Sequence, residues 1–248
     1  MKLEVPLLWV VLLFFTLFSC SANQENNPEK LELEKETVPD DTATPSNLKI
    51  LSLGDSYTIG ASVCQKCRFP EQLKDSIKEK TENLEIELKV IATSGWTTTA
   101  LKNAIANENL DENYDLCTLL IGVNNQYQRK PFDLFEKEFP ELVGEAIKYS
   151  KGKRDNLIVV SIPDYAFTPF GGGNSNITEE INKYNTFIEN YCKQYSITYI
   201  YITDITRQGL VQTELVASDG LHPSALAYSK FVSRILPEAL EKIGYNVD

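Results

Sequence analysis

Basic residues are few in this 248-residue sequence: 24 lysines and arginines stand against 35 aspartates and glutamates, and the formal net charge is −11. Residues 1–20 are neutral overall, and residues 21–46 hold seven acidic and two basic side chains, so the chain from residue 47 onward carries −6. An acidic surface repels polyanions, and no basic stripe is present. We therefore expect no nucleic-acid partner.

The sequence also lacks an apolar run of the roughly 20 residues that span a bilayer. The run from Pro6 to Phe18 follows a lysine at position 2 and is typical of the apolar region of a secretory signal. It ends in LFSC, which resembles a bacterial lipobox. That resemblance implies lipidation of Cys20 and a membrane anchor in the bacterial cell envelope, at the periplasmic or outer-membrane face. A soluble secreted protein and an uncleaved anchor remain alternatives.

Aromatic residues are absent from residues 20–46, a segment that is rich in acids and contains prolines. Such a segment buries too little apolar area to offset the entropy lost on ordering. We predict a signal peptide over 1–19, a disordered acidic tether over 20–46 and one folded domain over 47–248.

The domain shows no internal repeat, and its apolar runs alternate with longer helical patterns, which is typical of βαβ units. We predict a three-layer α/β/α sandwich with a flavodoxin-like parallel five-stranded sheet of order 2-1-3-4-5, which binds ligands at the carboxyl ends of its strands. Pro70 and Pro223 are predicted at first helical positions, and Thr178 as an N-cap. The predicted strands are 48–53, 84–92, 115–122, 156–163 and 197–203, and the predicted helices are 70–82, 97–108, 132–150, 178–195 and 223–243.

The sequence has a single histidine, His222, three residues after Asp219. A lone histidine is more often structural than catalytic, but Gly220 permits a bend that brings the carboxylate and the imidazole into one loop. Ser56 follows the first predicted strand and lies at the same edge of the sheet. A hydroxyl attacks an ester only when a base takes its proton, and a carboxylate orients that base. The alternative is a Gly-Asp-Ser turn without a catalytic role.

Four sequence blocks resemble the SGNH/GDSL hydrolase superfamily across residues 48–243, in order and each after a predicted strand: GDSYTIG, SGW, IGVNN and SDGLHP. The resemblance implies a serine esterase or acylhydrolase that forms an acyl-enzyme without metal or other cofactor. Ser56 would be the nucleophile, with Asp219 and His222 as its partners. The oxyanion hole would comprise the N–H groups of Ser56 and Gly95 and the Asn124 amide.

The substrate class stays open between acyl lipids and O-acetylated carbohydrates, and the oligomeric state is not indicated. Residues 161–176 form a glycine-rich segment typical of a mobile wall or lid, without the Gly-Lys-Ser/Thr of a phosphate loop. Six aromatic residues follow strand ends and are candidates for a substrate pocket: Tyr57, Trp96, Tyr127, Tyr165, Phe167 and Phe170.

Cys64 and Cys67 form a C-x-x-C pair, for which a structural disulfide, two free thiols and redox catalysis are all open. Cys117 and Cys192 are expected to be buried free thiols, and their spacing does not suit zinc. Two rivals to the esterase therefore remain. One is a non-catalytic envelope binding lipoprotein on the same scaffold, and the other is a thiol-disulfide module.

Overall fold

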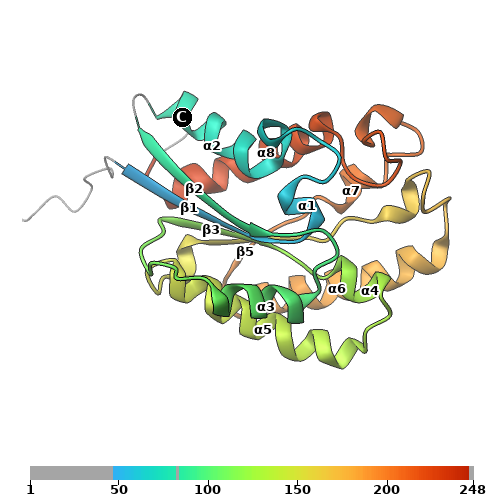
Figure 1. The fold of residues 1–248 in the computed structure, drawn as a ribbon, viewed down its shortest axis with the longest axis horizontal. Coiled ribbons are helices and arrows are strands. Elements are labelled where there is room, and N and C mark those ends of the chain that lie inside the picture. Colours follow the sequence, from blue (N-terminus) through green and yellow to red (C-terminus); the bar gives the residue numbers. More distant parts are fainter. Residues whose placement is uncertain (1–46, 82–83, 246–248) are drawn as a thin grey trace, which may run out of the picture. The chain divides into compact units, whose positions relative to one another are not determined.

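The computed structural model of the protein describes residues 47–81 and 84–245 (Figure 1). The predicted signal peptide and tether, residues 1–46, lie outside the described residues. The described chain contains a parallel sheet in the order β2-β1-β3-β4-β5, which confirms the predicted flavodoxin-like order. The strands are β1 (Asn47–Gly54), β2 (Glu85–Ala92), β3 (Leu116–Leu120), β4 (Leu157–Val160) and β5 (Thr198–Ile200).

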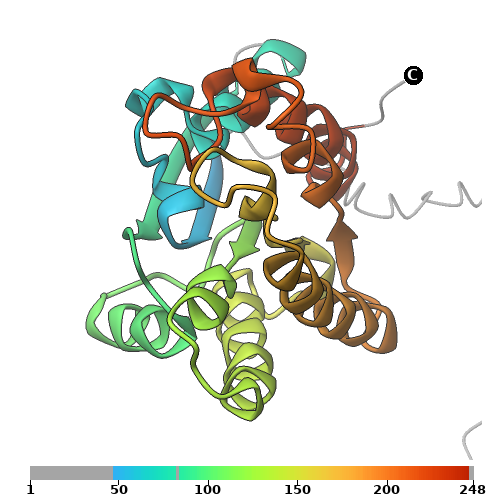
Figure 2. The ribbon, with the colours of Figure 1, turned by 90° about the vertical axis from the view of Figure 1, so that its right-hand side faces the viewer.

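Helices cover both faces of this sheet, which confirms the predicted three layers. In Figure 1, α2 and α8 lie above the sheet and α3, α5 and α6 lie below it, and Figure 2 shows the same layers after a quarter turn. The α-helices are α1 (Ser56–Ile59), α2 (Phe69–Lys80), α3 (Thr98–Asn107), α4 (Val123–Tyr127), α5 (Phe132–Tyr149), α6 (Ser175–Gln194), α7 (Thr203–Thr206) and α8 (Ala225–Lys242). The 3-10 helices are Gln65–Cys67, Arg154–Asn156, Tyr165–Phe167 and Thr213–Leu215.

The central strands are mostly apolar because helices cover both of their sides, and the buried Ser52 and Thr118 satisfy each other by a hydrogen bond of 2.9 Å. Every residue of β3 and β4 is buried, as is β1 from Ile50 to Gly54. Parallel strands of this kind give continuous apolar runs rather than alternating ones. The edge strand β2 instead exposes Glu85 and Glu87, and such charges discourage pairing with a further strand.

Strands β3, β4 and β5 end two or three residues before their predicted ends. The apolar residues beyond those ends, such as Ile121, Ile162 and Ile202, are buried in the core without being in the sheet, so an apolar run overestimates the strand. The short helices α1, α4 and α7 begin within three residues of strand ends. They bring polar side chains to the carboxyl edge of the sheet.

Two predicted helix starts are wrong. Thr178 lies inside α6, because Asn174 caps that helix by accepting a hydrogen bond from the Asn176 N–H at 3.0 Å. Pro223 precedes the N-cap of α8, which is Ser224, and pairs with Val216 in an isolated bridge. Asparagine and serine are strong caps, and each was available a few residues from the predicted start.

The glycine-rich segment 161–176 is less irregular than predicted. It contains the 3-10 helix Tyr165–Phe167 and the first two residues of α6. Within residues 47–81 and 84–245, no helix combines the length and the apolar character that crossing a membrane requires.

Candidate active site

Ser56 is the first residue of α1, two positions after the end of β1. Asp55 caps this short helix, and its Oδ1 accepts a hydrogen bond from the Tyr57 N–H at 3.0 Å. The turn needs glycine at position 54, because a Cβ there would lie 2.4 Å from the Leu120 carbonyl oxygen. Ser56 is nearly buried, with 4% of its surface exposed, yet it lines a cavity at the sheet edge.

His222 and Asp219 form a pair in the loop before α8. Asp219 Oδ2 lies 2.6 Å from His222 Nδ1, and Oδ1 accepts hydrogen bonds from the backbone N–H groups of Leu221 and His222. Ser62 Oγ donates a further hydrogen bond to Oδ2. Partial burial opposes ionisation of Asp219, but these donors outweigh it and hold the pKa of the carboxyl well below its usual range. Asp219 is therefore a carboxylate that orients the imidazole.

Ser56 and His222 line the same cavity of about 240 Å³. The ring of Tyr57 lies 5.1 Å from the imidazole, measured between centroids. Among the described residues no hydrogen bond joins Ser56 Oγ to His222. Such contacts are often long in a free enzyme and tighten when substrate binds. The structure thus brings the predicted nucleophile and base to one cavity without a hydrogen bond between them.

Gly95 lines this cavity from the loop after β2. Its φ of +83° is left-handed, a region that glycine adopts without strain. Gln128 Nε2 donates to the Gly95 carbonyl at 2.7 Å and so fixes this turn. In the described part of the chain, the backbone N–H groups of Ser56 and Gly95 have no hydrogen-bond acceptor. Both are free to bind a ligand oxygen.

Asn124 lies in α4, and its side-chain Nδ2 donates to Asp55 Oδ2 at 3.3 Å. An amide nitrogen has two hydrogens, so one remains for a ligand. Asp55 is fully buried, and this desolvation raises its pKa to about 7 despite the hydrogen bonds from Tyr57 and Asn124. Sequence reasoning gave Asp55 no role. The signal that was available is its position directly before the nucleophile, at the cap of a helix.

Asn125, which follows Asn124, has a structural role. Its Oδ1 accepts from the Thr98 N–H at 2.9 Å, and its Nδ2 donates to Thr98 Oγ1 at 2.7 Å. Thr98 Oγ1 donates in turn to Glu138 Oε2 at 2.5 Å, on α5. The two asparagines thus have different roles. Asn124 lines the cavity, and Asn125 links α4 by hydrogen bonds to Thr98, the first residue of α3.

Four of the six predicted pocket aromatics line the cavity, namely Tyr57, Tyr127, Tyr165 and Phe170. The described lining does not include Trp96 or Phe167. Trp96 is half-buried and packs against the hydrophobic core. Position after a strand end therefore does not suffice to place an aromatic side chain in the pocket.

The four cysteines within the described residues do not line the cavity. Cys64 and Cys67 form a disulfide in the segment between α1 and α2. Cys117 and Cys192 are buried free thiols, and burial raises the pKa of Cys192 to about 12. Across residues 47–81 and 84–245, no three histidine, cysteine, aspartate or glutamate side chains are grouped so that they could hold a metal ion.

Comparisons with known proteins agree with this arrangement. Residues 52–230 match the GDSL-like lipase/acylhydrolase family. No curated protein matches the chain.

Similar solved structures include Axe2, an acetylxylan esterase from Geobacillus stearothermophilus, with 18% identity over 80% of this chain and 95% of that one and a TM-score of 0.59. A lipase/acylhydrolase from Enterococcus faecalis gives 20% identity, coverage of 77% and 94%, and a TM-score of 0.59. A lipolytic protein of the G-D-S-L family from Veillonella parvula is 16% identical over 78% of this chain and 97% of that one, with a TM-score of 0.57. At these identities the likeness concerns the fold, whereas the family match spans most of the chain. The chain therefore belongs to the GDSL-like lipase/acylhydrolase family.

Proposed function

We propose that the protein is a serine esterase that cleaves carboxylic esters through an acyl-enzyme on Ser56. The observation that carries the proposal is that Ser56, His222, Gly95 and Asn124 line one cavity at the carboxyl edge of the sheet, in a member of a hydrolase family. A non-catalytic binding role is not favoured, because a scaffold without catalysis has no physical need for this combination.

In the proposed reaction, His222 Nε2 takes the Ser56 Oγ proton as the hydroxyl oxygen attacks the ester carbonyl carbon. Asp219 holds the Nδ1 proton and stabilises the imidazolium that forms. The imidazolium then gives its proton to the leaving alcohol, and the acyl group stays on Ser56. Water repeats the sequence, with His222 again as base, and releases the acid.

The negative charge of the tetrahedral intermediate is held by three donors from the segments that follow β1, β2 and β3: the Ser56 N–H, the Gly95 N–H and the Asn124 amide. Donors of this kind contribute roughly 2.7 to 4 kcal/mol each to transition-state stability. The free state of the two backbone N–H groups supports this assignment.

The substrate that we propose is an O-acetylated carbohydrate rather than a long-chain lipid. The cavity beside Ser56 measures about 240 Å³, which suits a short acyl group. Its apolar wall includes Val123, Phe170 and Leu221. The acetylxylan esterase among the similar structures supports this choice by analogy of fold.

We further propose that Cys20 carries lipid and tethers the domain to a membrane in a bacterial cell envelope. One buried methylene contributes about 0.8 kcal/mol, so several acyl chains would retain the domain at a membrane surface. Metabolic labelling of the full chain with a fatty-acid analogue, with Cys20→Ser as control, tests this. Label that persists in Cys20→Ser would contradict it.

A fluorophosphonate probe tests the enzymatic proposal. We expect one covalent adduct on Ser56, which peptide mapping locates, and hydrolysis of 4-nitrophenyl acetate faster than of the palmitate. Acetylated xylo-oligosaccharides test the sugar substrate by acetate release. Absence of labelling together with absence of hydrolysis of every ester would refute the proposal, and labelling elsewhere would refute the assignment of Ser56.

A further inference from the structure

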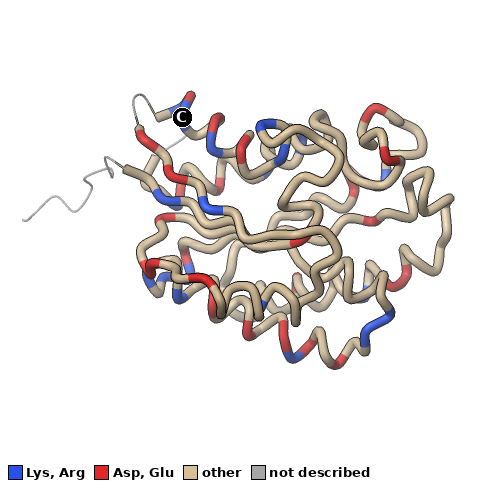
Figure 3. The backbone as a smooth tube through the Cα atoms, viewed as in Figure 1, with Lys and Arg blue, Asp and Glu red and all other residues tan. Residues whose placement is uncertain are grey.

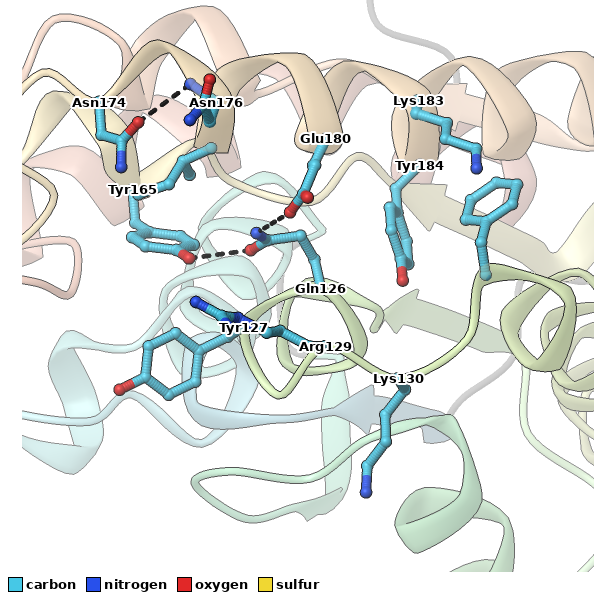
Figure 4. Close-up of a pocket in the computed structure, with 12 residues that line it drawn as sticks. Gln126, Tyr127, Arg129, Lys130, Tyr165, Asn174, Asn176, Glu180, Lys183 and Tyr184 are labelled. Carbon is cyan, nitrogen blue, oxygen red and sulfur yellow. Dashed lines mark hydrogen bonds between the residues drawn. The ribbon is translucent and has the colours of Figure 1, made fainter.

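A second cavity, of about 590 Å³, adjoins the one that contains Ser56. It lies between α4 and α6, and the two cavities share Tyr127 and Tyr165 (Figure 4). A molecule held in the larger cavity would therefore reach the nucleophile past these two rings.

The lining of this second cavity is polar and aromatic. Tyr165 Oη donates to Gln126 Oε1 at 2.9 Å, and Gln126 Nε2 donates to Glu180 Oε2 at 2.5 Å. These bonds fix the amide, as Figure 4 shows. Asn174 and Asn176 add further amide groups, and Ile177 is the aliphatic residue of the lining. Amides bind hydroxyl groups and aromatic faces pack on sugar rings, whereas an acyl chain needs aliphatic walls.

The cavity also gathers positive charge in an acidic domain. Arg129, Lys130 and Lys183 line it, against the single lining carboxylate of Glu180. Within the described residues none of the three cations forms an ion pair with a carboxylate. The connection between α4 and α5, which holds residues 129 and 130, stands out in blue in Figure 3. Unpaired cations around a cavity attract an anionic group.

Arg129 and Lys183 are the two cations placed to meet a ligand. In Figure 4 the Arg129 side chain runs toward Tyr127 and Tyr165, which is the side shared with the Ser56 cavity, and Lys130 points away from the Gln126–Glu180 bond. Lys183 Nζ lies 3.7 Å from the centroid of the Phe132 ring. A guanidinium binds a carboxylate through two parallel hydrogen bonds.

We infer that this cavity binds the alcohol part of the substrate, and that this part is a glycan carrying carboxylate groups next to the acetylated sugar. The inference rests on the proposed esterase function and adds the leaving-group chemistry to it. Arg129 and Lys183 bind the carboxylates, the amides bind hydroxyl groups, and the acetyl ester lies at Ser56. An anionic lipid headgroup offers the same charge but fewer hydroxyl groups for the amides.

Binding is tested separately from catalysis, with the Ser56→Ala protein and calorimetry. The probes are an O-acetylated trimer of β-1,4-linked glucuronic acid and O-acetylated cellotriose, which differ at C6, where the acid has a carboxylate and cellotriose a hydroxymethyl group. We expect the acidic trimer to bind more tightly and its affinity to fall with salt. Adding Arg129→Gln or Lys183→Gln should raise its Kd on the order of tenfold, the size of one charge-assisted contact, and change the cellotriose Kd less than about twofold. Equal effects on both probes, or none, would overturn the inference.

Lys230→Gln is the matched control, because Lys230 is exposed on α8, on the opposite face of the sheet. It removes the same charge and should change neither Kd. Circular dichroism confirms that each variant folds. In protein that retains Ser56, Lys230→Gln should hydrolyse 4-nitrophenyl acetate at an unchanged rate.

The O-acetylated acid trimer, O-acetylated cellotriose and lysophosphatidylglycerol are then compared as substrates of the protein that retains Ser56, with and without Arg129→Gln. A drop in kcat/KM confined to the trimer in Arg129→Gln supports the glycan, and a drop confined to the lysolipid overturns it in favour of a headgroup. Hydrolysis of the charged and the neutral esters at equal kcat/KM would refute this inference alone. Charge-dependent binding without hydrolysis of any ester would refute the esterase proposal instead.

Discussion

Ser62 Oγ donates a hydrogen bond of 2.6 Å to Asp219 Oδ2, although 157 positions separate the two residues. The same oxygen lies 2.6 Å from His222 Nδ1. Ser62 lies in the segment that follows α1, so this bond joins the segment after the proposed nucleophile to the loop that holds the proposed base. We infer that Ser62 is a positioning residue that keeps the carboxylate aligned with the imidazole.

Ser62→Gly should lower kcat by roughly fivefold and leave KM nearly unchanged, because one neutral-to-charged hydrogen bond is lost. Glycine is the suitable replacement, since the φ of 64° at Ser62 is one that glycine adopts freely. The lost hydrogen bond lowers stability, whereas glycine relieves the left-handed φ, so melting curves should show only a small net change. A raised KM with normal kcat would instead indicate a merely structural contact.

Ser56→Ala and His222→Ala should each reduce ester hydrolysis by roughly a thousandfold or more, and the double variant should be no worse than either single one, because the residues act as a unit. Thermal stability should change little in Ser56→Ala. Steady-state kinetics on purified protein measures all three variants. A double variant far slower than both singles would contradict a shared dyad.

Asp55 should make the protein less stable as the pH rises. Its pKa is about 7 in the folded chain against an ordinary value of 3.8, because burial disfavours the charge. Between about pH 4 and pH 7 the folded state therefore binds more protons than the unfolded state, and the free energy of unfolding falls over that window by an amount on the order of 2 to 4 kcal/mol. Urea unfolding at several pH values measures the slope.

Asp55→Asn should remove this contribution to the pH dependence of stability. It should also slow hydrolysis, because an amide NH₂ would face Asn124 Nδ2, which now donates a hydrogen bond to Asp55 Oδ2. Asp75→Asn, at an exposed carboxylate on α2, is the control. An unchanged pH dependence in Asp55→Asn would show that the carboxylate is already ionised at low pH.

The Cys64–Cys67 disulfide should contribute to stability and not to catalysis. Its loop of four residues corresponds to roughly 2 kcal/mol in the chain-entropy account. The Cys64→Ser, Cys67→Ser double variant should melt earlier and keep its kcat. Mass spectrometry with and without reductant should show a two-dalton change in the peptide that contains both cysteines. Reductase activity that survives Ser56→Ala would instead favour the thiol-disulfide interpretation.

The fold was predictable from the sequence because the central strands are buried on both faces and give continuous apolar runs. The same property hid the ends of β3 to β5, since buried residues such as Ile162 continue the run after the strand has ended. The start of α6 was missed because the letters NSNIT offer more than one capping residue, and Asn174 is the one used.

The site was predictable at Ser56, where a serine follows the end of β1, and at His222, which is the single histidine of the sequence and lies three residues after an aspartate. The supporting contacts were not, because they join distant parts of the chain. Nothing near Ser62 in the sequence points to Asp219, and Asn125 has the same residue type as its neighbour Asn124. Only the three-dimensional arrangement separates their roles.

The chain of hydrogen bonds from Asn125 through Thr98 to Glu138 connects the segments of the proposed oxyanion hole to α5, in the helical layer below the sheet. The segments that contain Gly95 and Asn124 are therefore held in place, because the nearby residues Thr98 and Asn125 are hydrogen-bonded in a network that ends at a buried carboxylate of α5. Inactivation by heat or urea should then coincide with the cooperative loss of the whole domain, with no earlier softening of the catalytic pocket.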